Sequence, residues 1–85
     1  MKVINMVNNN IKLFRTVNQK IRYYKITLFK NLFDEYLVTR EYGSIKNKKP
    51  TGVKTNYFFT KDESIEFIEK LLMLKIKKGY CEFKK

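Results

Sequence analysis

The side chains of this sequence that could do chemistry are mostly cations. Its 85 residues include 19 Lys and Arg against 8 Asp and Glu, which gives a formal net charge of +11. The segment from Arg40 to Lys61 is strongly basic, with Glu41 as its only acidic residue. A polyanion is the natural partner of such a surface, and nucleic acid is the first candidate. On charge alone, the alternative is a basic protein with no specific partner.

The residues needed for catalysis or metal binding do not form a recognisable set. The sequence contains no His that could act as a general base, and its three glycines do not match a phosphate-binding loop. Ser44 and Thr51 have no evident base to activate them. The single cysteine, Cys81, excludes an internal disulfide and a Cys/His metal cluster. We therefore predict no enzymatic activity, no catalytic residue, no metal and no cofactor.

The candidate binding residues centre on a loop expected from Gly43 to Thr55, which holds the only proline and two of the three glycines. Its lysines could contact phosphates, although solvated charges are the simpler interpretation. Tyr42 could stack on a nucleotide, or it could be a half-buried aromatic residue that ends a strand. The candidate nucleic-acid-binding residues are Lys20, Arg22, Arg40, Tyr42, Gly43, Ser44, Lys46, Lys48 and Lys49.

Two of these residues carry further expectations. Arg40 and Tyr42 are two positions apart on a predicted strand, so they should point to the same face of the sheet. Gly43 most simply supports a tight turn after that strand.

The elements that must position these residues are organised around a helix expected from Thr60 to Tyr80. Thr60 is a good N-cap with Glu63 three residues on, and Gly79 can take the left-handed conformation that ends a helix. An apolar stripe recurs at helical spacing: Ile65, Phe67, Ile68, Leu71, Leu72, Leu74 and Ile76. One such helix cannot bury its own stripe, so the remainder of the chain must supply a surface.

That surface is predicted to be a sheet of strands over residues 11–17, 21–29, 35–42 and 53–59, with a short strand or a docked tail after Gly79. In the clearest strand, Tyr24, Ile26 and Leu28 should face the helix. The fold class is therefore α+β: a mostly antiparallel sheet with one C-terminal helix packed on one face. Because no second helix is available, the opposite face should be solvated or bound, and we expect the binding surface there.

The length indicates one small domain, with residues 1–10 as an N-terminal extension and 11–85 as the domain. Within the extension, residues 3–7 could form an edge strand or dock on the surface. The beginning of the chain does not resemble a secretory signal, and no run approaches the roughly 20 apolar residues of a membrane span. We therefore expect a cytoplasmic protein without membrane contact. The sequence does not indicate its oligomeric state.

With these elements in place, residues 11–83 resemble a WGR domain. This small module, named for a Trp-Gly-Arg motif, occurs in DNA-dependent poly(ADP-ribose) polymerases and in many short bacterial proteins. The segment from Arg22 to Ile26 resembles the tyrosine-containing piece of its opening strand. Phe58, Thr60, Asp62 and Glu63 match the aromatic, cap and acidic positions before the helix, and Lys75 to Tyr80 match a Lys-Gly-Tyr ending.

The differences from the family fall on the eponymous motif. Tyr42 stands where Trp is expected, Gly43 is kept, Ser44 replaces Arg, and Lys46 replaces a Gly. The resemblance implies a DNA-binding module, in which Trp packs on the sugar at a DNA end. Tyr42 can still stack, whereas Ser44 lacks a guanidinium. Two alternatives stay open: a protein-interaction module that has lost DNA-end recognition and docks on an acidic partner, and an RNA-binding module whose sheet aromatics stack on single-stranded bases.

Overall fold

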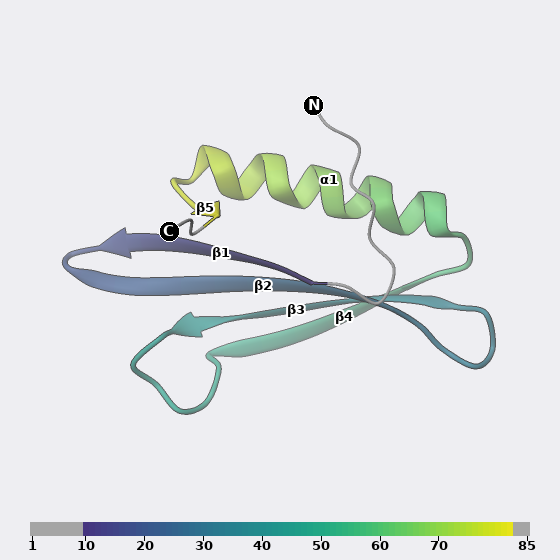
Figure 1. The fold of residues 1–85 in the computed structure, drawn as a ribbon, viewed down its shortest axis with the longest axis horizontal. Coiled ribbons are helices and arrows are strands. Elements are labelled where there is room, and N and C mark those ends of the chain that lie inside the picture. Colours follow the sequence, from purple (N-terminus) through teal and green to yellow (C-terminus); the bar gives the residue numbers. More distant parts are fainter. Residues whose placement is uncertain (1–9, 83–85) are drawn as a thin grey trace.

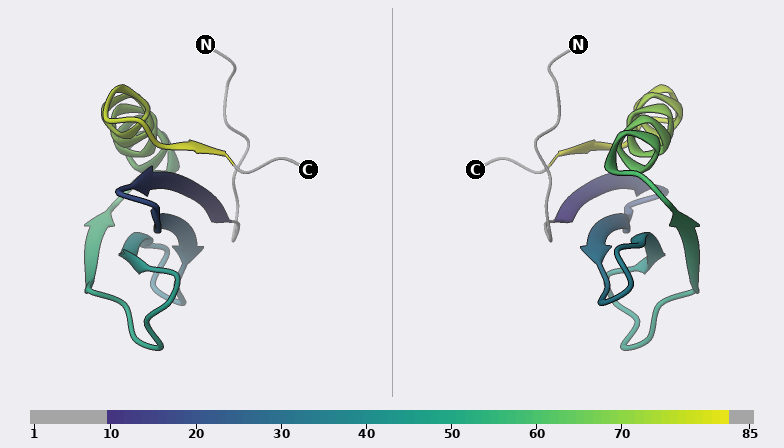
Figure 2. Two further views of the ribbon diagram at one scale, coloured as in Figure 1. Left: turned by 90° about the vertical axis from the view of Figure 1, so that its left-hand side faces the viewer. Right: turned by 90° about the vertical axis from the view of Figure 1, so that its right-hand side faces the viewer.

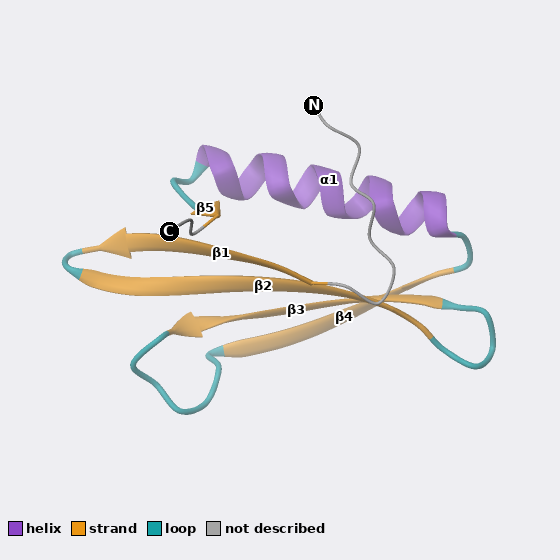
Figure 3. Ribbon diagram, in the orientation of Figure 1, coloured by secondary structure: helices purple, strands orange, loops and turns teal. Residues whose placement is uncertain are grey.

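The computed structural model describes residues 10–82 as five strands and one helix. The elements are β1 (Asn10–Val17), β2 (Lys20–Lys30), β3 (Tyr36–Ser44), β4 (Gly52–Phe58), α1 (Lys61–Lys77) and β5 (Cys81–Glu82). The strands form one antiparallel sheet in the order β4-β3-β2-β1-β5, and α1 lies along one of its faces (Figure 1, Figure 3). The predicted α+β fold is confirmed.

The prediction of an N-terminal extension falls almost entirely outside the described residues, and the domain boundary stays a prediction. Asn10, which we assigned to the N-terminal extension, is the first residue of β1. None of the helices within residues 10–82 has the length and apolar character needed to cross a membrane.

Helix α1 begins and ends as its sequence predicts. The Glu63 amide donates to Thr60 Oγ1 at 3.1 Å, so Thr60 is the N-cap. At the other end, Gly79 has φ +102° and its amide donates to the Ile76 carbonyl, while the Tyr80 amide donates to the Lys75 carbonyl, both at 3.0 Å. These two bonds form a Schellman motif, which reverses the chain and turns Tyr80 back toward the core.

The core lies between α1 and the sheet. Ile26, Leu28 and Val38 are at most 1% exposed, and Tyr24 is also buried, which confirms the predicted inner face of β2. The helix contributes Ile68, Leu71 and Leu72, with Ile65 and Phe67 partly buried. Leu74 and Ile76 are more than half exposed, so the predicted stripe is wrong for the last turn. Lys75 takes the place on the buried side there.

The connections divide the molecule into two ends (Figure 1). One end holds the β1–β2 turn, the loop of residues 45–51 and the C-terminus of α1; the other holds the β2–β3 connection and the N-terminus of α1. The β1–β2 turn consists of Asn18 and Gln19, both with positive φ, as a tight hairpin turn requires. Viewed end-on, loop 45–51 projects away from α1 (Figure 2).

Candidate nucleic-acid interface

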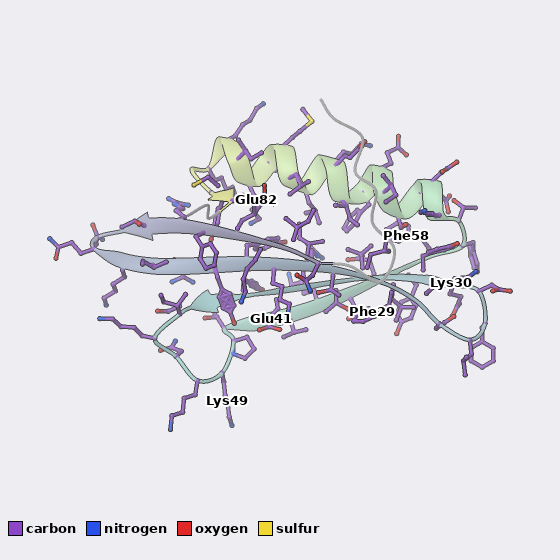
Figure 4. All side chains as sticks on the ribbon, in the orientation of Figure 1. Phe29, Lys30, Glu41, Lys49, Phe58 and Glu82 are labelled. Carbon is purple, nitrogen blue, oxygen red and sulfur yellow. The ribbon has the colours of Figure 1, made fainter. Side chains whose placement is uncertain are left out.

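Most of the sequence-predicted binding residues meet at the end of the sheet that holds the α1 C-terminus. Arg22 pairs directly with Ser44, and the Ile45 amide donates to the Ile21 carbonyl at 3.1 Å. The start of β2 therefore lies beside loop 45–51, whose lysines are exposed (Figure 4 labels Lys49). We call this region the basic end; its cations are Lys20, Arg22, Lys46, Lys48, Lys49, Lys77 and Lys78. The acidic residues Asp62 and Glu63 lie at the opposite end, in the first turn of α1.

The loop is shorter than predicted and is tied to the end of β3. The Asn47 amide donates to the Ser44 carbonyl at 3.1 Å, and the Thr51 amide donates to the Tyr42 carbonyl at 2.8 Å. The interpretation of Gly43 as a turn residue is wrong, because it lies inside β3 opposite Tyr23. A Cβ at Gly43 would come within 2.9 Å of the Thr51 amide nitrogen, so the glycine is needed for the close return of the loop.

Tyr42 and Arg40 share a face of β3 as predicted, but that face is the one covered by α1. Tyr42 pairs with Tyr24 and Arg40 pairs with Ile26, both of which are buried under the helix. Our expectation that these residues lie on the face away from the helix is therefore wrong. The Tyr42 ring packs edge-on to Tyr24 with centroids 5.8 Å apart, and it extends over Gly52 of β4.

Arg40 is a partly buried residue that joins the sheet to the helix. Its Nη2 donates to Asn56 Oδ1 at 3.0 Å, and its guanidinium carbon lies 5.5 Å from the centroid of the Phe67 ring. Its Nε is buried and has no hydrogen-bond partner within residues 10–82. Such an unpaired buried donor costs free energy. Arg40 is therefore more enclosed than a solvent-facing phosphate ligand would be.

Sequence reasoning missed a group of cations and tyrosines beneath the C-terminal turns of α1. Lys75 Nζ lies 4.2 Å from the centroid of the Tyr24 ring and 5.7 Å from that of Tyr80. The Arg15 guanidinium lies 5.8 Å from the Tyr80 ring centroid. We call this group the tyrosine–cation cluster: Arg15, Arg22, Tyr24, Arg40, Tyr42, Lys75 and Tyr80. The signal was in the sequence, because Lys75 lies seven residues after Ile68, on the apolar side of the helix.

The cluster concentrates positive charge, and none of its cations forms an ion pair with a carboxylate within residues 10–82. Arg15 lies directly opposite Arg22 across β1 and β2, an arrangement that is unfavourable for like charges. Partial burial lowers the pKa of Lys75, and repulsion from Lys78, Arg40 and Arg15 lowers it further. The ion pair between Lys30 and Asp34, which lies at the opposite end, is the only one among residues 10–82. An anion bound at the cluster would relieve this repulsion.

We expect Lys75→Met to raise the midpoint of thermal unfolding by a few degrees at low salt. The change removes a repelled, partly desolvated charge, while the thioether keeps the contact with the Tyr24 ring. Added phosphate should stabilise the original protein more than the variant, since an anion that binds only the folded state stabilises it. Lys70→Met, at an exposed position of the same helix, is the control. A lower midpoint for Lys75→Met than for Lys70→Met would contradict this account.

Nothing in the site suggests metal chemistry. Residues 10–82 hold no group of three or more His, Cys, Asp or Glu side chains that could bind a metal ion. What the arrangement offers is a group of cations around buried and half-buried tyrosine rings, on the side of the sheet that α1 covers. The fold and the site together define a small α+β binding module.

Comparison with known families assigns this module. A family model described as the WGR domain matches residues 9–85. The chain therefore belongs to the WGR domain family, whose members are small nucleic-acid-binding domains without catalytic activity. Comparisons with curated proteins and with solved structures gave no match.

Proposed function

We propose that this protein is a non-enzymatic module that binds DNA through its basic end. Loop lysines Lys46, Lys48 and Lys49 contact the phosphates, and Tyr42 lies against a nucleotide at an end or a nick. The observation that carries the proposal is the gathering of cations from β2, the loop and the C-terminus of α1 at one end of the sheet. Figure 1 shows that these three segments lie at the same end of the molecule. Phosphate contacts of this kind position a duplex without reading its bases.

Charge repulsion within the free protein supports a polyanionic ligand. Arg15 and Arg22 face each other, and Lys75 is repelled by Arg40 and Lys78. A duplex brings closely spaced phosphates, and each phosphate that a cation neutralises also releases condensed counterions. The same contacts therefore relieve repulsion in the protein and gain free energy from the DNA.

Arg22 offers a substitute for the arginine that the Trp-Gly-Arg motif would place at Ser44. The two residues are directly opposite each other on β2 and β3, so their side chains leave the same face of the sheet. Tyr42 lies on that face as well, two residues before Ser44. An aromatic ring and a guanidinium are thus present together, although the guanidinium comes from the neighbouring strand. We include Arg22 in the DNA contact for this reason.

The test is a fluorescence-anisotropy titration with short duplexes, at about 50 mM and 200 mM salt. Blunt 5′-phosphorylated, nicked and covalently closed circular DNA compete for the same protein. We expect affinity to fall steeply with salt, and ends or nicks to compete better than closed circles. Equal competition would leave a DNA binder without a preference for ends. Affinity that does not respond to salt, or no binding at all, would overturn the proposal.

One observation favours the alternative of a protein-interaction module. Leu32, Phe33 and Phe59 are at least 82% exposed, and they lie at the end of the molecule opposite the basic end. Exposed large apolar side chains mark protein-docking surfaces when they are contiguous. If the titration shows no DNA binding, replacement of Leu32 and Phe33 by Ser tests whether this end binds a protein partner instead.

We expect Gly52→Ala to weaken binding to DNA ends by about 10-fold while the protein stays folded. A Cβ at Gly52 would lie 2.5 Å from Tyr42 Oη, so the ring must rotate away from its place. Stacking of a base on an aromatic ring contributes about 1–3 kcal/mol. Thr55→Ala, on the opposite face of β4, is the control. Anisotropy titration of both variants checks the prediction, and unchanged affinity in Gly52→Ala would exclude a contribution from the Tyr42 ring.

A further inference from the structure

The face of the sheet away from α1 has its own pattern of side chains. Lys12, Lys25 and Glu41 form one row across β1, β2 and β3, and Phe14 and Tyr23 form the next row. Directly paired residues of antiparallel strands project from the same face, and these rows alternate with the buried residues of the core. In Figure 4, the labelled Glu41 and Phe29 lie on the side of the sheet away from α1. This face is the open face.

A pocket of ≈ 250 Å³ joins the open face to loop 45–51. Its lining includes Lys12, Phe14, Tyr23, Lys25, Glu41 and Asn47. The lining is mainly polar, with Phe14 and Tyr23 as its aromatic residues, and it includes Asn47 of the loop that carries the exposed lysines. The volume suits a flat group the size of one nucleobase and is too small for a duplex groove.

The tyrosine in this pocket is held in a fixed orientation. The Tyr23 hydroxyl donates to Glu41 Oε2 at 3.0 Å. Partial burial and the hydrogen bond to the neighbouring Glu41 carboxylate raise the pKa of the Tyr23 phenol above its ordinary value. Lys12 Nζ lies 6.0 Å from the centroid of the Tyr23 ring. The pocket therefore presents a preorganised ring with an ammonium group over one of its faces.

These groups match the chemistry of an unpaired nucleotide. An aromatic face stacks on any base, and ammonium groups at Lys12 and Lys25 suit the flanking phosphates. The free lone pairs of the Glu41 carboxylate and the amide of Asn47 can meet the hydrogen-bonding edge of a base. In a duplex the base faces are stacked and the edges are paired, so only a single strand can enter such a site.

We infer that the open face is a second nucleic-acid site, which binds single-stranded DNA or RNA through a nucleotide stacked on Tyr23. It is distinct from the tyrosine–cation cluster, because Tyr23 and Tyr24 are consecutive residues of β2 and point to opposite faces. The inference does not depend on duplex binding at the basic end, because the two sites take different forms of nucleic acid.

The test titrates oligo(dT) and oligo(U) of about 12 nucleotides, in parallel with a blunt duplex. We expect Tyr23→Leu to weaken single-strand binding about 10-fold or more and to change duplex affinity less than about twofold. Tyr23→Phe, which keeps the ring, should retain most of the single-strand affinity. Tyr57→Leu is the matched control. Tyr57 is an exposed tyrosine of β4 that lies on the open face, as Tyr23 does, but outside the pocket. A difference in affinity between oligo(dT) and oligo(U) identifies DNA or RNA as the preferred single strand, and tighter binding of either one supports the site.

Three results would overturn the inference: no single-strand binding by the original protein, equal single-strand binding by the Tyr23→Leu and Tyr57→Leu variants, or a Tyr23→Phe variant as weak as Tyr23→Leu. Loss of duplex binding alone would instead count against the proposed function and leave this site standing. Far-ultraviolet circular dichroism and thermal unfolding of each variant separate a folding defect from a binding defect. The Tyr23→Phe variant keeps the test valid if Tyr23→Leu does not fold.

Discussion

Replacement of Lys46, Lys48 and Lys49 together by Ala is expected to reduce the slope of log affinity against log salt for duplex DNA by about 3. The three side chains are exposed on loop 45–51, where each can reach a phosphate without disturbing the core. Each lost phosphate contact removes roughly one released counterion. Affinity at low salt should fall most, and the variants should converge as salt rises. Anisotropy titrations across a salt series measure the slope.

The control for this triple variant removes the same charge elsewhere. Lys30, Lys61 and Lys70 lie at the end of β2, in the first turn of α1 and in the middle of α1. The exposed ion pair of Lys30 with Asp34 contributes little stability, so its loss should not affect folding. If phosphate contact is local to the basic end, this second triple should change the slope by less than half as much. Equal slopes in the two triples would mean that net charge alone drives binding.

Ile26→Ala should destabilise the protein by about 2–5 kcal/mol, the largest effect expected of any single change in this fold. Ile26 is 0% exposed and lies at the centre of the sheet beneath α1. Its truncation leaves a cavity that the stiff sheet cannot close. In a domain of this size, 1 kcal/mol corresponds to a shift of about 4–8 °C in Tm. Thermal and urea unfolding measure the loss. Because the total stability of such a domain is small, we expect part of the Ile26→Ala variant to be unfolded at 37 °C.

Two variants calibrate that result. Ile26→Val removes one methylene and should cost about 0.5–1.5 kcal/mol. Leu32→Ala, at a side chain that is 98% exposed, should stay within about 0.5 kcal/mol of the original protein. A loss in Ile26→Ala no greater than that in Leu32→Ala would show that the helix does not pack on the sheet as described.

The local features of the chain were predictable because each depends on nearby residues. Thr60, Gly79 and the charges at both ends of α1 determine where the helix begins and ends. The run from Ile21 to Phe29 predicts a strand, and its alternation identifies Tyr24, Ile26 and Leu28 as the buried set. The exposure of Leu74 and Ile76 was also predictable, since both flank Lys75, which lies seven residues after Ile68 on the buried side of the helix.

The faces of β3 could not be assigned in the same way. One set of alternating residues is Tyr36, Val38, Arg40 and Tyr42, and the other is Leu37, Thr39, Glu41 and Gly43. Each set mixes apolar and polar side chains, so the period-two pattern does not select an inner face. The register with β2 decides it, because Tyr42 pairs with the buried Tyr24 and Val38 with the buried Leu28.

By itself, therefore, the sequence determined the fold class and the family resemblance, because these depend on local propensity, apolar periodicity and composition. Only the tertiary structure decided which residues act together. It placed Tyr42 and Arg40 under the helix, set Arg15 and Arg22 opposite each other, and left Tyr23 with Glu41 on the open face. The physical reason is strand pairing: register joins residues far apart in the sequence, and a shift of one residue would exchange the two faces.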